Sequence, residues 1–291
     1  MHTIRIATRS SVQARTQASA VAQLLQQHHP NIETELIFVD TAGDKNTDTP
    51  IHEMGGQGVF VKEVQRAVLD GRADIAVHSA KDLTSEPTEG LEISAFTARR
   101  TPNDALIGCS LHQLPMGGTV ATGSVRRRAQ LRAVRPDLQF VELRGNIHTR
   151  LSKIPENGAI VMAVAALEIV GLTNHISEIL DLDLAVPMVG QGCVAVESRS
   201  KDAQLREILA SIDDLRTRRS VETERAFLRE LGAGCSMPVA AHVSPDDTFR
   251  AFMAEGDTVV QVSGSLEDTD EHKLMGVAVA QECKRRIANG H

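Results

Sequence analysis

Seven arginines lie within residues 126–150 of a chain whose formal net charge is −7: Arg126, Arg127, Arg128, Arg132, Arg135, Arg144 and Arg150. Three of them directly follow Ser124 in SVRRRAQLRAV, which predicts the first turn of a helix after a strand that ends near Thr122. A helix N-terminus favours anions, so three cations there cost stability unless an anion binds them. The pattern predicts a pocket for a ligand with several carboxylates or phosphates. The alternative is a solvated basic face.

Two other strand ends carry the same kind of residues. A predicted strand ends at Leu143, and Asn146 can cap the next helix, which carries Arg150. The first predicted strand ends at Arg9 and Ser11. Charges that begin helices at strand ends favour a ligand site over a solvated basic face.

The segment His78-Ser79-Ala80-Lys81-Asp82 follows the buried strand pattern DIAV, so it also lies where a ligand site is expected. Asp82 could act as an acid or base, or it could stabilise a developing positive charge. The alternative is that Asp82 only caps a turn or pairs with Lys81.

Cys235 lies between small residues in GAGCS, after a predicted helix, where a thiol can be exposed and reactive. The alternative is a buried apolar cysteine, which is the interpretation given to Cys109, Cys193 and Cys283. The four cysteines show neither CxxC nor Cys/His ligand spacing. We therefore expect reduced thiols and no metal site.

Strand and helix patterns alternate along most of the chain, which predicts α/β lobes with parallel sheets. Strands are expected at 3–8, 33–40, 74–79, 104–108, 118–122, 138–143 and 158–164. Helices are expected at 12–27, 60–70, 124–134, 146–153, 164–170, 202–210 and 217–231. Segments 97–104 and 185–198 are interpreted as crossings between lobes. Residues 41–58 are rich in turn formers and predict a lid or binding loop.

The last part of the chain has a different pattern, with three antiparallel strands within 239–265 and a covering helix at 270–288. We therefore expect two α/β lobes and a smaller C-terminal α+β domain. The expected boundaries are 1–98 with 194–214 for domain 1, 99–193 for domain 2 and 215–291 for domain 3.

Composition excludes several partners. The chain has no Trp and no Tyr, so the arginines lack the aromatic platforms of single-stranded nucleic-acid binding. It has no apolar run of the roughly 20 residues that a membrane span needs. Its first residues, MHTIRIATRSS, lack a signal-peptide core. We expect a cytoplasmic protein that binds neither nucleic acid nor membrane.

Taken in order, these motifs resemble the porphobilinogen deaminase (hydroxymethylbilane synthase) family. The resemblance covers nearly the whole chain in eight stretches: RIATRSS (5–11), GGQGVFVKE (55–63), ADIAVHSAKDL (73–83), ATGSVRRRAQL (121–131), PDLQFVELRGNIHTRLSK (136–153), VGQGCVAVE (189–197), TERAFL (223–228) and GAGCSMPV (232–239).

The resemblance implies a transferase that joins four porphobilinogen molecules head to tail, releases ammonia each time and forms linear hydroxymethylbilane. Each pyrrole carries an acetate and a propionate, so the growing chain is a polycarboxylate of the kind that the arginines predict. The resemblance also implies a dipyrromethane cofactor linked by a thioether to Cys235. The implied fold is two periplasmic-binding-protein-like lobes around a cleft, with a third lobe that carries the cofactor, in a monomer.

The resemblance assigns roles to individual residues. Asp82 matches the catalytic aspartate, which is thought to assist loss of the amino group and to stabilise a cationic pyrrole. The positions that hold cofactor carboxylates match Ser79, Lys81, Thr122, Ser124, Arg126, Arg127, Arg144 and Arg150. Substrate-binding positions match Arg9, Ser11, Arg144 and Arg150.

The chain departs from the family pattern at a few positions. Gln57 and Ile169 stand where many members have a basic residue, and Gly123 and Thr84 replace a hydroxyl residue and a proline. A non-catalytic two-lobe carboxylate-binding protein remains the alternative, because a shared fold does not imply a shared function. Asp82 and Cys235 discriminate between the two, since a receptor needs neither.

Overall fold

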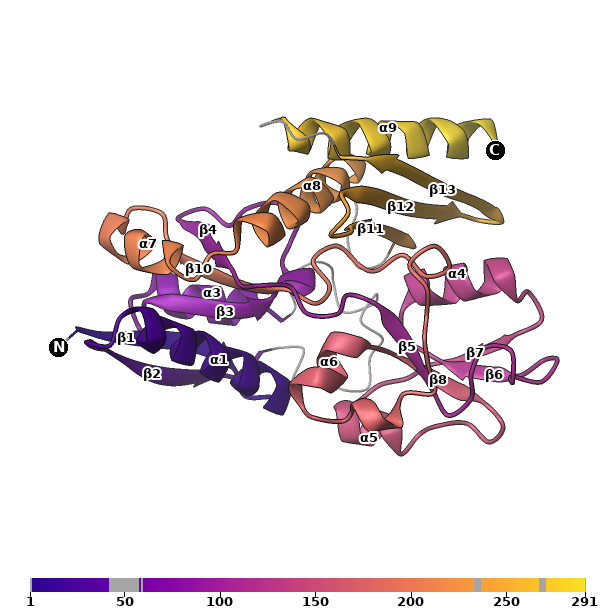
Figure 1. Cartoon of the computed structure of the whole chain (residues 1–291), viewed down its shortest axis with the longest axis horizontal. Coiled ribbons are helices and arrows are strands. Elements are labelled where there is room, and N and C mark those ends of the chain that lie inside the picture. Colours follow the sequence, from indigo (N-terminus) through magenta and orange to yellow (C-terminus); the bar gives the residue numbers. More distant parts are fainter. Residues whose placement is uncertain (1, 42–57, 59, 233–236, 267–270, 291) are drawn as a thin grey trace.

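The computed structural model describes residues 2–41, 58, 60–232, 237–266 and 271–290. The described chain forms two five-stranded sheets and one three-stranded sheet (Figure 1). Helices accompany all three, and the three-stranded sheet with its helices lies above the two larger lobes in Figure 1. This arrangement confirms the predicted class of two α/β lobes plus a smaller C-terminal α+β unit.

The first sheet has the strand order β2-β1-β3-β10-β4. Its strands are β1 (His2–Arg9), β2 (Ile32–Val39), β3 (Ile75–Ser79), β4 (Leu91–Phe96) and β10 (Val194–Arg199). Strand β1 pairs in parallel with β2 and β3, whereas β10 is antiparallel to β3 and β4. The expectation that 185–198 is entirely a crossing segment is therefore wrong in its second half, and β4 was not predicted.

The second sheet repeats this plan in the order β7-β6-β8-β5-β9. Its strands are β5 (Asp104–Ile107), β6 (Thr119–Ala121), β7 (Gln139–Val141), β8 (Ala159–Ala163) and β9 (Glu178–Ile179). Strand β6 is parallel to β7 and β8, and β5 is antiparallel to β8 and β9. Each lobe thus has one antiparallel strand that follows a crossing from the other lobe, so the expected purely parallel sheets are not found.

Helix α1 (Val12–His28) shows why these helices form and where they pack. Ala18, Val21, Ala22 and Leu25 follow the i, i+3, i+4, i+7 spacing of one helix face, and all four are buried against the first sheet. The Oγ of Ser11 caps the helix by accepting a hydrogen bond from the backbone N–H of Ala14, at 3.3 Å.

The other helices flank the strands of the two lobes. The first lobe has α3 (Lys62–Leu69), the one-turn η2 (Ala80–Asp82) and α7 (Ala203–Ala210). The second lobe has α4 (Val125–Val134), α5 (Ile147–Leu151), α6 (Val164–Ile169) and the one-turn η3 (Thr173–His175). Helices η2 and α6 follow directly on β3 and β8, whereas short loops separate α4 from β6 and α5 from β7.

The third sheet is antiparallel, with β11 (Val239–Val243), β12 (Thr248–Glu255) and β13 (Thr258–Ser265). Helices α8 (Leu215–Leu231) and α9 (His272–Asn289) cover it, with α9 outermost in Figure 1. Phe227 and Phe249 pack edge to face in its core, with ring centroids 6.1 Å apart. Among the helices of the described ranges, none combines the length and apolar character of a membrane span.

Candidate active site

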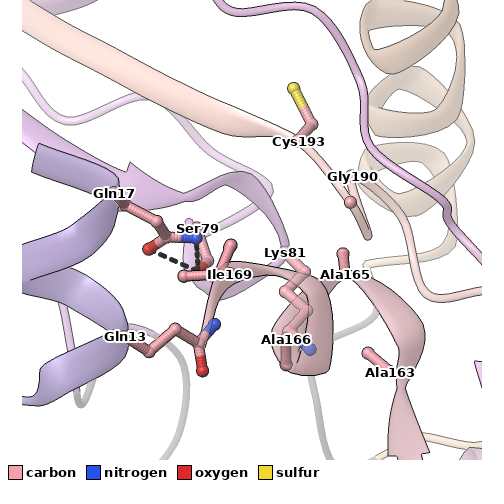
Figure 2. Close-up of a pocket in the computed structure, with 11 residues that line it drawn as sticks. Gln13, Gln17, Ser79, Lys81, Ala163, Ala165, Ala166, Ile169, Gly190 and Cys193 are labelled. Atoms are coloured by element: carbon pink, nitrogen blue, oxygen red, sulfur yellow. Dashed lines mark hydrogen bonds between the residues drawn. The ribbon is translucent and has the colours of Figure 1, made fainter. Parts of the chain in front are cut away.

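A pocket lies between the two lobes, where β3 and β8 end (Figure 2). The first lobe lines it with polar side chains: Gln13, Gln17, Ser79 and Lys81. The second lobe lines it with apolar ones: Ala163, Ala165, Ala166 and Ile169. The second crossing segment closes it with Gly190, Gly192 and Cys193. The pocket therefore has one wall that can hydrogen-bond and one that can pack against an apolar ring.

Ser79 is held in place on the polar wall. Its Oγ exchanges hydrogen bonds with the side-chain amide of Gln17, at 3.0 Å to Nε2 and 3.2 Å to Oε1 (Figure 2). Gly192 brings the closing segment near, because it has a φ of +85° and a Cβ there would lie 2.6 Å from the carbonyl oxygen of Arg100. A side chain at 192 would therefore push the two crossing segments apart.

Lys81 and Asp82 lie on the one-turn helix η2 at the end of β3. Burial lowers the pKa of Lys81 to about 8; Asp82 opposes this shift, and Arg127 adds to it. Lys81 therefore lies close enough to Arg126 and Arg127 of α4 for their charges to lower its pKa. Burial lowers the pKa of Arg150, and Asp82 opposes this shift in part, so the carboxylate lies near cations of both lobes.

Arg126 and Arg127, in the first turn of α4, share a counterion that was not predicted. Arg126 Nη2 donates to Asp104 Oδ2 and Arg127 Nη2 donates to Asp104 Oδ1, each at 2.7 Å. Burial raises the pKa of Asp104, but the charges of Arg126 and Arg127 outweigh burial and hold it well below its usual range. Arg126 also donates to the carbonyl oxygen of Val186, at 2.7 Å.

Two hydroxyls support this turn. Ser124 is the N-cap of α4, and its Oγ accepts a hydrogen bond from the backbone N–H of Arg127, at 3.4 Å. Thr122 is buried, and its Oγ1 accepts one from the backbone N–H of Ser124, at 3.2 Å. In this structure both side chains therefore shape the loop that presents the arginines.

Arg144 and Arg150 come from the next strand end. Asn146 caps α5 by accepting a hydrogen bond from the backbone N–H of Thr149, at 2.9 Å, and Arg150 Nε donates to the carbonyl oxygen of Gly145, at 2.8 Å. Burial, together with the nearby charges of Arg127 and Arg144, lowers the pKa of Arg150 to about 10. Neighbouring positive charges repel one another, so Arg127, Arg144 and Arg150 together favour an anionic ligand.

The remaining arginines of the cluster point to other partners. Arg128 Nη2 donates to Glu142 Oε1, at 2.7 Å, and the guanidinium carbon of Arg132 lies 5.2 Å from the ring centroid of Phe140. Arg135 forms an ion pair with Asp137 at the far end of α4, with 2.7 Å between Nε and Oδ1. The cluster is therefore divided, and only part of it belongs to the site.

Arg9 and Ser11 lie at the end of β1, in the first lobe. The guanidinium carbon of Arg9 lies 4.2 Å from the ring centroid of Phe60, and Ser11 caps α1. Substrate contact by these two residues stays a prediction.

Cys235 and Gln57 lie outside the described residues. The other cysteines, Cys109, Cys193 and Cys283, are free thiols. Burial raises the pKa of Cys193 to about 12 and that of Cys283 to about 11, which disfavours the reactive thiolate at both. Within the described ranges, no three His, Cys, Asp or Glu side chains gather as metal ligands would.

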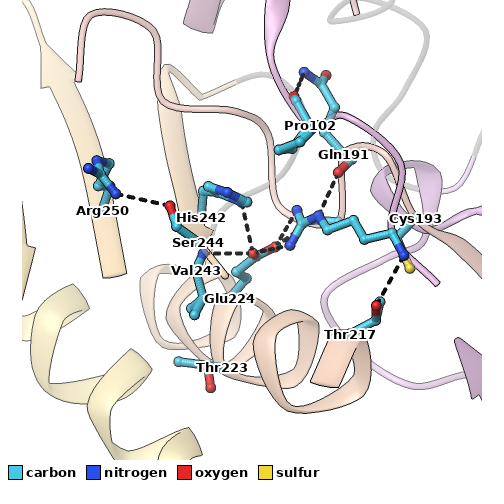
Figure 3. Close-up of polar contacts among 12 residues, drawn as sticks. Pro102, Gln191, Cys193, Thr217, Thr223, Glu224, His242, Val243, Ser244 and Arg250 are labelled. Atoms are coloured by element: carbon cyan, nitrogen blue, oxygen red, sulfur yellow. Dashed lines mark hydrogen bonds and ion pairs between the residues drawn. The ribbon is translucent and has the colours of Figure 1, made fainter. Parts of the chain in front are cut away.

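Sequence reasoning missed a second buried carboxylate, Glu224 of α8 (Figure 3). Its oxygens accept hydrogen bonds from Arg99 Nη1 at 2.6 Å, from the backbone N–H of Gly190 at 2.8 Å and from that of Val243 at 2.9 Å. His242 Nδ1 lies 3.3 Å from Glu224 Oε1. One side chain thus joins both crossing segments to the third domain.

The fold and the site define a two-lobed α/β protein whose interlobe pocket has a polar wall that includes Lys81, and the charges of Arg126 and Arg127 act on this lysine. A family model described as "Porphobilinogen deaminase, dipyromethane cofactor binding domain" matches residues 4–207, and a second, "Porphobilinogen deaminase, C-terminal domain", matches residues 218–285. The chain belongs to the porphobilinogen deaminase family, as the sequence motifs indicated. The family model also makes dipyrromethane the cofactor, again as the motifs indicated.

Curated relatives agree over nearly the full length. The porphobilinogen deaminase of Xanthomonas oryzae pv. oryzae (strain PXO99A) is 47% identical over 295 residues, which cover 100% of this chain and 96% of that protein. The porphobilinogen deaminase of Geobacter sulfurreducens is 40% identical over 291 residues, covering 97% and 91%. These matches support the enzyme and not the non-catalytic alternative.

Among solved structures, the methionine-binding protein MetQ matches 75% of this chain and 90% of that chain, with a TM-score of 0.45 and 12% sequence identity.

Proposed function

We propose that this protein joins four porphobilinogen molecules head to tail, with release of ammonia at each step, to give linear hydroxymethylbilane. The observation that carries the proposal is the meeting of Lys81, Asp82, Arg127 and Arg150 at the junction of the two lobes in a member of the porphobilinogen deaminase family. Cations that gather around one carboxylate suit a polycarboxylate whose reaction passes through positive charge.

The donor set fits a dipyrromethane cofactor. Lys81, Arg126, Arg127, Arg144 and Arg150 provide five positive charges, which Asp82 and Asp104 offset only in part. Arg127 Nε is buried without a hydrogen-bond partner among the described residues, so a ligand carboxylate near it would satisfy this donor. We assign the cofactor carboxylates to Ser79, Lys81, Thr122, Ser124, Arg126, Arg127, Arg144 and Arg150.

In this proposal, Asp82 is the catalytic residue. When bound, the dipyrromethane supplies the pyrrole to which the first substrate unit is joined. The Asp82 carboxylate stabilises the positive charge that develops on the substrate pyrrole as its amino group leaves, and it accepts a hydrogen bond from the pyrrole N–H. Arg9, Ser11, Arg144 and Arg150 hold the carboxylates of incoming porphobilinogen.

We assign cofactor attachment to Cys235 because the GAGCSMPV stretch matches the family motif that carries the attachment cysteine. Burial raises the thiol pKa of Cys193 and Cys283, which disfavours attachment at those two. We also propose the domain division 1–98 with 194–214, 99–193 and 215–291, in which each part contains one sheet. A cytoplasmic monomer that binds no nucleic acid completes the proposal.

Two measurements on the purified protein test it: its intact mass, and the consumption of porphobilinogen with release of ammonia. A two-pyrrole adduct together with turnover is the expected result. A bare chain that still binds porphobilinogen but neither gains mass nor releases ammonia on incubation would overturn the proposal in favour of carboxylate binding alone.

A further inference from the structure

Asp104, the first residue of β5, is fully buried and accepts hydrogen bonds from three side chains. Its Oδ2 accepts from Arg126 Nη2 at 2.7 Å, and its Oδ1 accepts from Arg127 Nη2 at 2.7 Å and from Gln191 Nε2 at 2.8 Å. The donors come from α4 and from the second crossing segment. A single carboxylate thus fixes the arginine helix relative to the segment that closes the pocket.

The charges around Asp104 do not cancel. One carboxylate faces two guanidinium groups, and Lys81 is close enough for the charge of Asp104 to oppose part of the lowering of its pKa. The cluster keeps a net positive charge, so Asp104 can orient the arginines without removing their attraction for a ligand carboxylate. Without Asp104, Arg126 and Arg127 would repel one another in a region that excludes water.

The hydrogen bonds around Asp104 fix the orientation of the Arg127 side chain. Its Nη1 donates to the carbonyl oxygen of Val161 at 3.0 Å and its Nη2 donates to Asp104, so both ends of the planar fork are fixed. The direction of Nε–H follows from the plane of the guanidinium group. This Nε is the buried donor that lacks a partner among the described residues. A buried donor without a partner is unfavourable, and a ligand carboxylate would satisfy it.

Gln191 links Asp104 by hydrogen bonds to residues of the first crossing segment. Its Nε2 also donates to the carbonyl oxygen of Pro102 at 2.7 Å, and its backbone carbonyl accepts from Arg99 Nε at 2.9 Å (Figure 3). Arg99 in turn pairs with Glu224. A continuous chain of hydrogen bonds therefore runs from Arg127 through both crossing segments to the third domain.

We propose that Asp104 is a positioning residue for the deaminase reaction: it holds the Arg127 guanidinium in the orientation that binds ligand carboxylates. Through its hydrogen bond with Gln191, it also links this orientation to the position of the crossing segments. This inference rests on the proposed function. A purely structural ion cluster would make a different prediction, in which loss of Asp104 lowers the melting temperature and leaves KM unchanged.

Asp104→Asn keeps the side-chain size and removes the charge. The fraction of purified protein with the two-pyrrole mass and the KM and kcat for porphobilinogen are then measured. We expect a lower loaded fraction and, in the loaded enzyme, a KM raised roughly tenfold or more, in line with a weakened charge-assisted hydrogen bond. A variant with wild-type KM and wild-type loading would overturn the inference, whereas an inactive wild type would overturn the proposed function instead.

Asp213→Asn is the matched control. Asp213 is a partly buried carboxylate that accepts hydrogen bonds from Arg218 Nε at 2.6 Å and from the backbone N–H of Phe96 at 2.7 Å, but neither partner belongs to the arginine cluster of α4. We expect this control to lower the melting temperature without changing KM. An equal rise of KM in both variants would show that general destabilisation is the cause.

A double-mutant cycle with Arg127→Lys separates positioning from direct contact. If Asp104 acts through Arg127, the double variant has the same KM as Arg127→Lys alone; additive effects would contradict the inference. If Asp104→Asn does not fold, Gln191→Leu provides the second test, because it leaves both arginine pairs intact and removes only the link. We expect Gln191→Leu to raise KM severalfold, and an unchanged KM would remove the proposed coupling.

Discussion

Arg99 and Glu224 form a buried ion pair, with 2.6 Å between Nη1 and Oε1, that joins the first crossing segment to helix α8. Glu224 also accepts the backbone N–H groups of Gly190 and Val243. The first crossing, the second crossing and the third domain therefore share one carboxylate. The relative placement of all three depends on its charge.

Glu224→Gln should destabilise the fold by about 3–5 kcal/mol, because it leaves the Arg99 guanidinium buried without a counterion. Urea unfolding measures this loss. Glu282→Gln is the control, since Glu282 pairs with Arg285 and Arg286 on the exposed side of α9, where ion pairs contribute little. Equal stability of the two variants would contradict the role given to Glu224.

The same residue gives the stability a pH dependence. Burial raises the pKa of Glu224, but Arg99 and then His242 outweigh burial and lower it to about 2, against 4.5 for an ordinary glutamate. A carboxyl with a depressed pKa stabilises the fold above the unfolded value, and this contribution is lost as the pH falls from 4.5 towards 2. Unfolding measured across that window should show a smaller pH slope for Glu224→Gln than for the wild type.

Asp82→Asn should stop turnover and leave the two-pyrrole mass in place. The amide keeps the size of the side chain but lacks the charge that stabilises a cationic pyrrole. Porphobilinogen consumption and intact mass are measured on the same sample. Asp74→Asn is the control, because Asp74 pairs with Arg5 at the opposite end of the sheet strands. Near wild-type turnover in Asp82→Asn would remove this residue from the mechanism.

Cys235→Ser should yield protein without a covalent pyrrole, because a hydroxyl is a far weaker nucleophile than a thiolate near neutral pH. Cys193→Ser should keep the adduct although Cys193 lines the pocket. Intact mass and peptide mapping distinguish the two. An adduct found on Cys109, Cys193 or Cys283 would show that the attachment site is another residue.

Arg127→Leu should block cofactor assembly or early elongation, whereas Arg128→Leu should cost little. Both residues lie in the first turn of α4, but Arg127 reaches Asp104 and Arg128 reaches the partly exposed Glu142. The loaded fraction by mass and the initial rate report the difference. Equal losses in the two variants would contradict the division of the cluster.

Ile169→Arg should lower KM, because it adds a cation to the apolar wall of the pocket. A charged donor holds a carboxylate better than a neutral group by roughly 1 kcal/mol. Ile169→Gln is the control, as it adds length and hydrogen bonding without charge. Identical KM values for wild type and Ile169→Arg would show that the existing cations already satisfy the substrate.

The sequence was most informative where residue type and strand position coincide. Lys81, Asp82, Arg127 and Arg150 were assigned to one site by the family motifs and by their positions near the ends of predicted strands. That assignment stays a prediction, although the charges of Asp82 and Arg127 act on both Lys81 and Arg150. Asp104 and Glu224 were missed for a physical reason. A lone acidic residue has no local pattern that reveals burial, since its partners come from distant segments.

The prediction of the strands was limited in the same way, because local sequence does not reveal contacts with distant segments. Residues 194–198 of β10 were included in the predicted crossing segment 185–198. This strand contains Glu197, which is buried beside Gln65 and His78. Whether such a segment forms a strand, and in which sheet, depends on its pairing with β3 and β4, most of whose residues lie more than a hundred positions earlier in the chain. Local periodicity carries no information about that choice.

The position of β10 between β3 and β4 has a consequence for synthesis of the chain on the ribosome. The second sheet has all its strands once Ile179 has emerged, but the first still lacks an inner strand until Arg199 has emerged. The lobe that begins the chain is therefore the later of the two to close. During that interval the facing edges of β3 and β4 stay unpaired. Unpaired edges can pair with strands of other polypeptides, so the nascent chain is exposed to aggregation at this point.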